Sequence, residues 1–471
     1  MTYDYDVIVI GLGPAGMAVS IMGTEMGLRV CAIEKRFIGG ECMNVGCIPS
    51  KALLSMAKAR FDVTRLPEMA LSALPAPAVA NPFQLIADYI RYINDAKNTK
   101  MFEKVTLLLG EGAAHFVDPH TVAVGERRMT ARRIYIGTGT QPAMPPIPGL
   151  DRIDDVLTNE NIFHLDQLPR SMVIIGGGAI GCEMAQAFTR LGCPCSIVHL
   201  DARLLPLADP DLGEALEQAF RREGIPVYNG RRIKEIARRA DGMVLVRTED
   251  GEELAGERLL VAAGRSIVLD GLDLDKAGVR YGRRGIEVDR YLRTSQRHIY
   301  AVGDCNGYSL FTHAAMHQGM LALMNSMIPG PFKLDYRTYV IPWTVFTTPM
   351  ISQVGRTRAQ LEEAGVSFEE ITARYDDYGA AIAENIAEGY VSAYISPAGR
   401  ILGAKIVGEG SGEMIGEWAL AIQKKVRITD IMMLQHSFPT MSFQSKQVSE
   451  KWMMGKMKSK MLQRLCRFMF R

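Results

Sequence analysis

Two cysteines near the N-terminus, Cys42 and Cys47, have the clearest chemical potential in this sequence. They stand five positions apart in the segment G-G-E-C-M-N-V-G-C-I-P-S-K, which covers residues 39–51. We expect them on the first turn of a helix, where the helix dipole lowers the pKa of a thiol and favours the thiolate. A pair of this kind can close a disulfide and relay two electrons.

A glycine-rich turn precedes the cysteines. The glycines of its G-x-G-x-x-G pattern are Gly11, Gly13 and Gly16. A β-branched run over residues 5–10 leads into the turn, a helical pattern follows over 17–26, and a second apolar run ends in Glu34. Glycines at this junction let the backbone approach a pyrophosphate at a helix N-terminus, and an acid about 20 residues on can bind a ribose. The segment therefore predicts a βαβ dinucleotide site.

The same unit recurs 165 residues later in the chain. Its glycines are Gly176, Gly178 and Gly181. An apolar run at 172–175 precedes them, and a helical pattern at 183–190 and a second apolar run at 195–198 follow. Two dinucleotide sites on one chain predict a flavin domain and a nicotinamide domain, with hydride passing between them.

Three further strand-like runs end at residues that suit a binding cleft. The run at 133–136 meets a turn that contains Gly139, and a similar run at 259–263 ends in Gly264. A third run ends in Asp304, which would place a carboxylate where a strand opens into a cleft. From residue 336 onward, alternating apolar residues indicate an α+β region without a dinucleotide pattern.

Composition and charge narrow the function classes. The 54 basic and 52 acidic residues leave a net charge of +2, which gives no excess for binding nucleic acid. The first basic residue is Arg29, and no apolar stretch approaches the roughly 18 residues of a membrane span, so we expect neither a signal peptide nor a transmembrane helix. Eight cysteines suit a reducing compartment, and we predict a cytoplasmic protein without a metal site.

The segment at residues 39–51 resembles the cysteine motif of the pyridine nucleotide-disulfide oxidoreductases, and the likeness extends in order over nearly the whole chain. This family includes dihydrolipoamide dehydrogenase, glutathione reductase and mercuric reductase. The resemblance implies an α/β homodimer with two Rossmann-like dinucleotide-binding domains and a C-terminal α+β dimerisation domain. The domains implied are FAD-binding at 1–150 and 275–335, NAD(P)-binding at 151–274, dimerisation at 336–450 and a basic amphipathic tail at 451–471.

The resemblance also implies catalytic roles. Cys42 is similar to the thiol that meets substrate, and Cys47 to the thiolate that contacts the flavin. Lys51 resembles the lysine near flavin N5, and Glu183 its ion-pair partner.

Cofactor-binding roles follow in the same way. Glu34 would hold the adenosine ribose of FAD and Asp304 its ribityl-phosphate region. The other cofactor-binding residues implied are the two sets of turn glycines together with Gly40, Gly139 and Gly264.

The second dinucleotide leaves the choice of nicotinamide open. His199 lies 23 residues after Gly176, the same spacing that separates Glu34 from Gly11. A neutral histidine accepts from a ribose hydroxyl, whereas a protonated one favours the 2′-phosphate of NADPH. Asp201 opposes a phosphate, so we predict NADH, with NADPH as the alternative.

The chain departs from the family pattern near its C-terminus. Disulfide reductases of this family carry H-P-T-x-x-E, whose histidine and glutamate form an acid–base pair. The matching positions here are Phe438 and Phe443, so we predict an electron acceptor other than an ordinary disulfide. Mercuric reductase also lacks the histidine but has a C-terminal cysteine pair, and this chain has only Cys466 there. One alternative is a dihydrolipoamide dehydrogenase-like enzyme that uses His436 as the base.

The last 21 residues contain seven basic residues and no acid. Five of the basic residues recur at helical spacing: Lys456, Lys460, Arg464, Arg467 and Arg471. Apolar residues fall mainly on the other side, so we predict a basic amphipathic helix that binds an acidic partner or an anionic membrane, or that packs on the dimer. A second alternative function is therefore a flavoprotein subunit of a larger membrane- or partner-bound electron-transfer complex.

Overall fold

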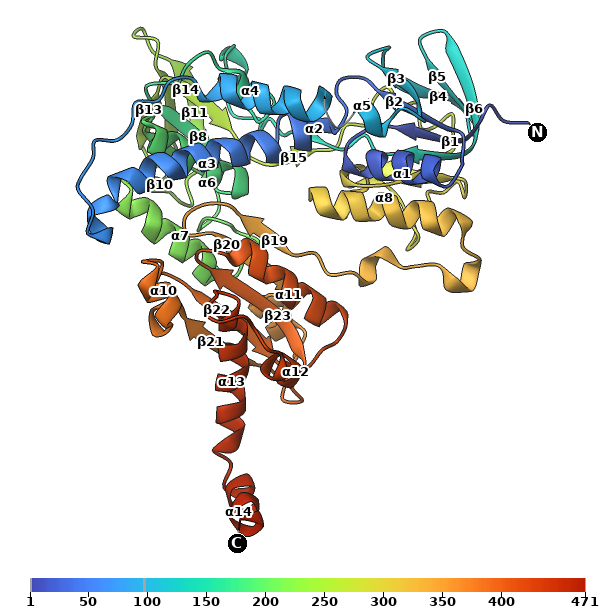
Figure 1. The fold of residues 1–471 in the computed structure, drawn as a ribbon. Coiled ribbons are helices and arrows are strands. Elements are labelled where there is room, and N and C mark those ends of the chain that lie inside the picture. The colour runs from blue at the N-terminus through green and yellow to red at the C-terminus, as the bar shows by residue number, and fades with distance from the viewer. Residues whose placement is uncertain (1, 96–98, 471) are drawn as a thin grey trace.

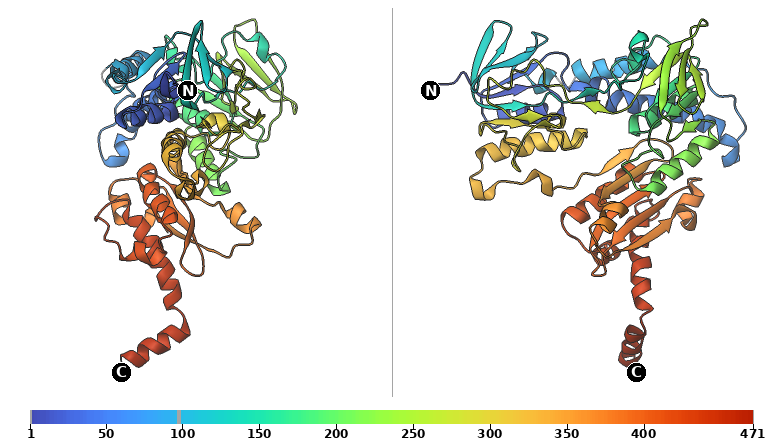
Figure 2. Two further views of the ribbon diagram at one scale, coloured as in Figure 1. Left: turned by 90° about the vertical axis from the view of Figure 1, so that its right-hand side faces the viewer. Right: turned by 180° about the vertical axis from the view of Figure 1, so that it is seen from behind.

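The computed structural model describes residues 2–95 and 99–470, and it divides into three parts, each organised around a main sheet. Figure 1 places the sheet that contains β1 at one side and the sheet that contains β8 at the other. The third sheet lies below them, and the chain leaves it through helices that project away from the body in every view (Figure 2).

The first sheet combines parallel strands with an antiparallel arm, in the order β3-β2-β1-β6-β5-β4. Residues 131–136 of β6 pair in parallel with β1, whereas residues 127–130 pair antiparallel with β5. β18 comes from late in the chain and also pairs in parallel with β6, which completes the sheet. The strands are β1 (Tyr5–Ile10), β2 (Val30–Glu34), β3 (Thr106–Leu109), β4 (Ala114–Asp118), β5 (Thr121–Val124), β6 (Arg127–Ile136) and β18 (Ile299–Ala301).

Helices α1 and α8 pack together on one face of the first sheet (Figure 1). The other face packs against a second apolar cluster that includes Phe116 of β4 and Val122 of β5. The parallel strands are therefore buried on both faces, which explains their nearly continuous β-branched composition. The helices that accompany this part and lead out of it are α1 (Pro14–Glu25), α2 (Gly40–Asn44), α3 (Cys47–Thr64), α4 (Pro82–Ile93), α5 (Thr99–Met101) and α8 (Thr312–Met327).

The second main sheet is fully parallel, in the order β10-β9-β8-β14. A three-stranded antiparallel sheet in the order β11-β12-β13 accompanies it. The elements are β8 (Met172–Ile175), α6 (Ala179–Leu191), β9 (Cys195–Val198), α7 (Pro210–Arg222), β10 (Val227–Tyr228), β11 (Ile233–Arg238), β12 (Val244–Thr248), β13 (Glu253–Gly256) and β14 (Arg258–Val261). Two small ladders pair β7 (Gln141–Pro142) with β15 (Arg265–Ser266), and β16 (Tyr281–Gly282) with β17 (Gly285–Ile286).

The third sheet is antiparallel, in the order β19-β20-β23-β22-β21, and packs against helices. Its strands are β19 (Trp343–Val345), β20 (Ile351–Gly355), β21 (Glu369–Arg374), β22 (Tyr390–Ile395) and β23 (Ile401–Val407). The helices are α9 (Arg358–Glu363), α10 (Gly379–Ala383), α11 (Ser411–Gln423), α12 (Ile428–Met433), α13 (Phe443–Met457) and α14 (Lys460–Met469). The predicted fold class, two Rossmann-like units followed by an α+β region, is confirmed.

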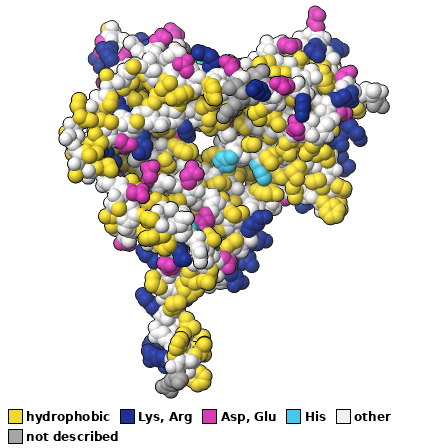
Figure 3. All heavy atoms as spheres, viewed as in Figure 1, with side chains coloured by type: hydrophobic (Ala, Val, Ile, Leu, Met, Phe, Trp, Pro, Cys, Tyr) yellow, Lys and Arg dark blue, Asp and Glu magenta, His cyan; other side chains and the backbone are white. Residues whose placement is uncertain are grey.

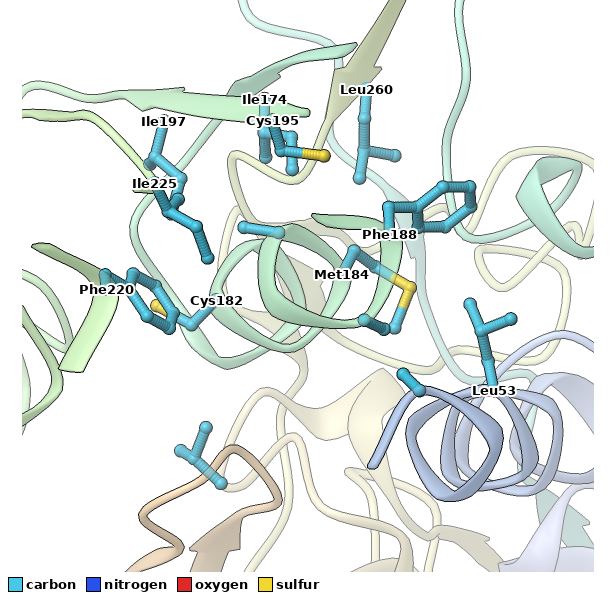
Figure 4. Close-up of a cluster of buried hydrophobic side chains, with 14 of the residues drawn as sticks. Leu53, Ile174, Cys182, Met184, Phe188, Cys195, Ile197, Phe220, Ile225 and Leu260 are labelled. Carbon is cyan, nitrogen blue, oxygen red and sulfur yellow. The ribbon is translucent and has the colours of Figure 1, made fainter. Parts of the chain in front are cut away.

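One apolar core joins the cysteine-bearing helix α3 to the second unit. Leu53 of α3 belongs to the same buried cluster as Met184 and Phe188 of α6 and Ile174 of β8 (Figure 4). The cluster fixes the distance between α3 and α6 because close-packed side chains leave little freedom to slide. Side chains that point from these two helices into the cleft are therefore held in register.

Candidate active site

A large cleft brings together the chemically active residues of the first two units. Its volume is about 2120 Å³, roughly twice that of the largest drug-sized pockets, about 1000 Å³. The lining includes both glycine turns, both N-terminal cysteines, and the residues Lys51, Glu183, His199 and Asp304. A space of this size suits two dinucleotides placed end to end.

The first glycine turn leaves a cradle at the start of α1. Gly11 has a φ of +91°, and a Cβ there would lie 2.5 Å from the carbonyl oxygen of Gly137. A Cβ at Gly16 would lie 1.9 Å from the carbonyl oxygen of Gly11, so the protein's own packing requires both glycines. Gly13 precedes the helix and a Cβ there would meet nothing within 4 Å. That free space at a helix N-terminus fits the pyrophosphate of FAD.

The second turn repeats this arrangement. Gly176 has a φ of +122°, and a Cβ there would lie 2.3 Å from the carbonyl oxygen of Ala262. A Cβ at Gly181 would lie 2.0 Å from the carbonyl oxygen of Gly176. Gly178 precedes α6 and a Cβ there meets nothing within 4 Å, so a second cradle fits the pyrophosphate of NAD(P)H.

Gly40, Gly139 and Gly264 also line the cleft, whereas Gly16 and Gly181 do not. The last glycine of each turn lets helix and strand approach closely and is not a contact surface for a ligand.

Glu34 is fixed at the end of β2 by the backbone of the first turn. Its carboxylate accepts hydrogen bonds from the backbone N–H groups of Leu12 and Arg36, both at 2.8 Å. The residue is buried yet lines the cleft, so the carboxylate is oriented where an adenosine ribose would lie.

His199 occupies the corresponding place in the second unit, but its ring is buried. Asn229 donates from its amide to Glu217, so its carbonyl oxygen accepts from Nε2–H of His199 at 2.6 Å. Nδ1 lies 3.8 Å from Asp201, too far for a hydrogen bond, and a Cβ on Gly177 would lie 2.8 Å from it. The ring therefore packs beneath the glycine turn, a placement that spacing alone did not indicate.

The two cysteines belong to separate helices. Cys47 is the first residue of α3, as predicted, whereas Cys42 lies on the short helix α2. The prediction of one shared turn was wrong because the chain leaves the helical conformation at Gly46, whose φ of −133° and ψ of −110° separate the two helices.

The cysteine environments differ in the way a thiol–thiolate pair requires. A hydrogen bond from Cys42, another from Thr312 and the positive charge of Lys51 together lower the pKa of Cys47 to about 6, against the opposing effect of burial. The hydrogen bond to Cys47 and burial raise the pKa of Cys42 well above its usual range. The Thr312 hydroxyl lies 3.3 Å from the Cys47 sulfur. Cys47 is therefore the thiolate at neutral pH, and Cys42 stays protonated.

Lys51 and Glu183 meet across the α3–α6 interface. Nζ of Lys51 lies 2.8 Å from Oε2 of Glu183, whose side chain is 6% exposed. Glu183 also accepts from the backbone N–H of Phe346 at 3.0 Å, and the ring of Phe346 lies 4.4 Å from Nζ. These contacts hold the lysine one helical turn from Cys47.

Asp304 belongs to a polar cluster that sequence reasoning identified only in part. Burial raises the pKa of Asp304, while the guanidinium of Arg265 and a hydrogen bond from Thr140 at 3.3 Å oppose this. Arg265 also forms an ion pair with Glu41 and bonds to Asn159. Arg265 and Glu41 each stand beside a predicted residue, Gly264 and Cys42, and that adjacency was the available signal.

The C-terminal loop is aromatic where the family pattern has an acid–base pair. Phe438 is 72% exposed, and Phe443 stacks on Tyr378 with ring centroids 6.0 Å apart. His436 points elsewhere: its Nε2 lies 2.9 Å from Glu417, and its side chain is 5% exposed. No pattern in the sequence indicates the Glu417 contact, because Glu417 lies on helix α11 and His436 lies in the loop before α13.

Two features, a metal-binding cluster and a membrane-spanning helix, are absent from residues 2–95 and 99–470. The described residues contain no group of three or more His, Cys, Asp or Glu side chains that could hold a metal ion. Within the same ranges, no helix is both long and apolar enough to cross a bilayer.

Two dinucleotide cradles that share a cleft with a thiol–thiolate pair define a flavin- and nicotinamide-dependent oxidoreductase. Residues 5–319 match the model of the pyridine nucleotide-disulphide oxidoreductase family, and residues 341–447 match the family's dimerisation domain. The chain belongs to this family, whose members use FAD and NAD(P)H. The resemblance inferred from the cysteine motif is thereby confirmed.

Relatives with different substrates match the chain equally well. A mercuric reductase from Streptomyces lividans is 32% identical over 452 residues, which cover 93% of this chain and 94% of the relative. A dihydrolipoyl dehydrogenase from Chlorobaculum tepidum is 32% identical over 458 residues, with 93% and 95% covered. Overall similarity therefore does not identify the acceptor.

A solved structure agrees with the fold along almost the whole chain. The HOCl-induced flavoprotein disulfide reductase RclA from Escherichia coli superposes with a TM-score of 0.84 at 26% identity, covering 95% of this chain and 99% of RclA. RclA has also been solved as a Cu(II) complex.

Proposed function

We propose that this enzyme passes electrons from NAD(P)H through FAD to the Cys42–Cys47 pair and on to an acceptor other than an ordinary disulfide. The observation that carries the proposal is the loop with Phe438 and Phe443 at the acid–base positions. A phenylalanine neither donates nor accepts a proton, and reduction of a disulfide requires a proton for the departing thiolate.

The residues of the cleft have distinct tasks in this proposal. FAD and NAD(P)H supply hydride and two-electron transfer when bound. Glu34 and the first glycine turn would orient FAD, and the second glycine turn would orient NAD(P)H. Glu183 holds Lys51 so that its charge favours the Cys47 thiolate, which leaves the Cys42 thiol to meet the acceptor.

Metal cations are the acceptor class that best fits a missing acid. When the Cys42 thiol and the Cys47 thiolate close to a disulfide they release two electrons and one proton, and one Hg(II) or two Cu(II) ions take the electrons without a protonated leaving group. The mercuric reductases among the relatives and the Cu(II) complex of RclA support testing this class first. The C-terminal cysteine pair that the family resemblance associates with mercury is reduced here to the single exposed Cys466.

The test is a comparison of acceptors with the purified holoenzyme. We expect reduction of Cu(II) or Hg(II) complexes, or of quinones, to exceed reduction of lipoamide and glutathione disulfide by about 100-fold or more. Fast native turnover of lipoamide would overturn the proposal.

Fast lipoamide turnover would favour the dihydrolipoamide dehydrogenase-like alternative, in which His436 replaces the missing base. Its burial against Glu417 argues against this alternative, because the ring would have to leave its partner to reach a substrate. A flavoprotein subunit of a larger electron-transfer complex is the second alternative, and strong dye reduction beside weak reduction of all small acceptors would favour it.

NADH is the proposed nicotinamide. Two arginines of the second half of the cleft already have acidic partners: Arg231 pairs with Asp250, and Arg232 lies 3.7 Å from Glu249. These carboxylates compete with a 2′-phosphate for the two arginines, and Asp201 at the same edge would repel one. The proposed assembly is a cytoplasmic homodimer, which the family's dimerisation domain supports.

A further inference from the structure

In the described part of the C-terminal tail, residues 458–470, no side chain forms an ion pair or a hydrogen bond with the body, apart from Gln463, which donates to the end of α13 at Met457. Every described residue from 457 to 470 is exposed, and the helix α14 lies at the end of the projection (Figure 2). The match to the dimerisation domain ends at residue 447, so this segment extends beyond the family's common fold. Arg471, the last basic residue of the predicted stripe, lies outside the described residues.

The structure divides the predicted tail helix in two. Helix α13 ends at Met457 and α14 begins at Lys460. Lys456 belongs to the body, because it pairs with Glu369 and lies 5.1 Å from the ring of Trp452. The exposed amphipathic unit is therefore α14, with Phe470 directly after it.

Helix α14 separates charge from apolar surface. At 100° per residue, Lys460, Arg464 and Arg467 fall within an arc of about 60°. None of the three forms an ion pair with a residue in the described part of the chain. The apolar residues cover an arc of about 160° on the other side: Met461, Leu462, Leu465, Cys466, Phe468 and Met469. Figure 3 shows basic and hydrophobic side chains side by side on this projection.

We propose that α14 binds the surface of an anionic lipid membrane, with its apolar arc in the lipid and its basic arc at the headgroups. A basic amphipathic helix with Phe and Leu on one face and no acidic residue is typical of segments that lie in the bilayer interface. The exposed fractions of the apolar side chains are large, 81% for Met461 and 75% for Phe468, and burying them in lipid is favourable.

A lipid surface fits these observations better than an acidic protein does. An acidic partner would satisfy the three basic side chains but would leave most of the wide apolar arc in water. A lipid interface accepts both arcs and needs no shape complementarity. Ten residues span only about 15 Å along the helix axis, too short to cross a bilayer, so the helix would lie in the interface.

A second tail on the same particle would strengthen the attachment. A single short amphipathic helix binds lipid weakly and reversibly. In a homodimer with two tails, binding of the first tail holds the second tail near the membrane. The second tail then binds at a high effective concentration, which raises the overall affinity.

The experiment is sedimentation of the full-length holoenzyme with vesicles of phosphatidylcholine alone or with 30% phosphatidylglycerol added, the enzyme being followed by its NADH–dye activity. We expect binding to the anionic vesicles only, weakening as salt is raised. Lys460→Gln with Arg464→Gln and Arg467→Gln should weaken it about 100-fold, at about fivefold for each charge removed.

Two further variants distinguish a lipid membrane from the other possible binding partners of the tail. Met461→Ser with Leu465→Ser and Phe468→Ser should weaken vesicle binding at least tenfold. Arg283→Gln with Arg284→Gln and Arg297→Gln removes the same charge from exposed positions outside the tail and should leave binding unchanged. The dye activity of all three variants should equal that of the native enzyme, because none touches the cleft.

Three results would overturn the proposal. The first is no binding to anionic vesicles, or equal weakening by the control triplet. The second is binding of polyglutamate by the native enzyme and the serine triplet alike without vesicle binding, which would make the tail a site for an acidic protein. The third is a shift of the monomer–dimer equilibrium by the tail variants without vesicle binding, which would make it a subunit contact.

Discussion

The cysteine segment at residues 39–51 and the C-terminal loop at 436–443 are the two regions where this family places its redox and proton-transfer groups. In this enzyme the first is rich in paired polar groups: Cys47 contacts Thr312, and Lys51 pairs with Glu183. The second presents an exposed aromatic surface, with its histidine turned toward Glu417.

This difference is the basis of the proposed function, in which electron transfer is separated from proton transfer. The residues that stabilise a thiolate in the cleft are all in place, so the cysteine pair can be reduced and oxidised. The group that would protonate a departing thiolate is missing from its expected position. Under the proposed function, an enzyme built in this way would favour acceptors that need electrons and no proton from the protein.

Removing the thiolate should have the largest effect. We expect Cys47→Ser to lower turnover of dithiol-dependent acceptors by more than about 1000-fold, because serine does not ionise or form a disulfide. The two-electron-reduced enzyme should show a long-wavelength charge-transfer absorbance between the Cys47 thiolate and the flavin. This absorbance should disappear in Cys47→Ser, whereas Cys42→Ser should show it without reductant. Anaerobic titration measures this, and unchanged turnover in both variants would contradict the role given to the pair.

Introducing the family's acid–base pair at positions 438 and 443 should reduce the difference in turnover between metal acceptors and disulfide acceptors. Phe438→His combined with Phe443→Glu should raise lipoamide turnover about tenfold or more and leave metal reduction nearly unchanged, since a general acid contributes typically 10²–10⁴-fold. Phe438→Leu with Phe443→Leu is the matched control for loss of the aromatic rings. Equal gains in both double variants would show that the gain comes from loss of the two aromatic rings and not from a restored acid–base pair.

The second dinucleotide site should respond to charge at His199 by a smaller amount. His199→Glu should strengthen the preference for NADH and His199→Arg should improve use of NADPH, each by about 1 to 2 kcal/mol, or roughly fivefold to 30-fold in kcat/KM. The buried ring bonds to Asn229, so Asn229→Ala serves as a control for disturbance of the turn. Unchanged selectivity in both charge variants would place His199 outside the nucleotide contact.

The Thr312 hydrogen bond should have the smallest measurable effect. Since the pKa of Cys47 is lowered to about 6, its thiolate should persist above pH 6 and be lost as the pH falls below it. Thr312→Val removes a donor to the thiolate and should move this midpoint upward by about 1 pH unit. A pH titration of the long-wavelength absorbance gives both midpoints, and a downward shift would contradict the assignment of the thiolate.

The sequence alone predicted the features that depend on local backbone chemistry. The positive φ of Gly11 and Gly176, and the close approach at Gly16 and Gly181, follow from the strand–turn–helix pattern, since only glycine fits these positions. The expected helix does begin at Cys47, whereas Cys42 was expected on the same turn and lies on a separate helix. The sequence was therefore sufficient to predict the cysteine motif, the order of the three parts and the family.

Tertiary structure alone decided the contacts between residues far apart in the chain. The pairing of Lys51 with Glu183 over 132 positions depends on the apolar core that locks α3 against α6. The burial of His199 beneath Gly177 and the turning of His436 toward Glu417 depend on how whole elements pack. Short-range sterics select a backbone shape residue by residue, whereas a side chain's partner is set by the closure of sheets and cores, which spacing along the sequence does not encode.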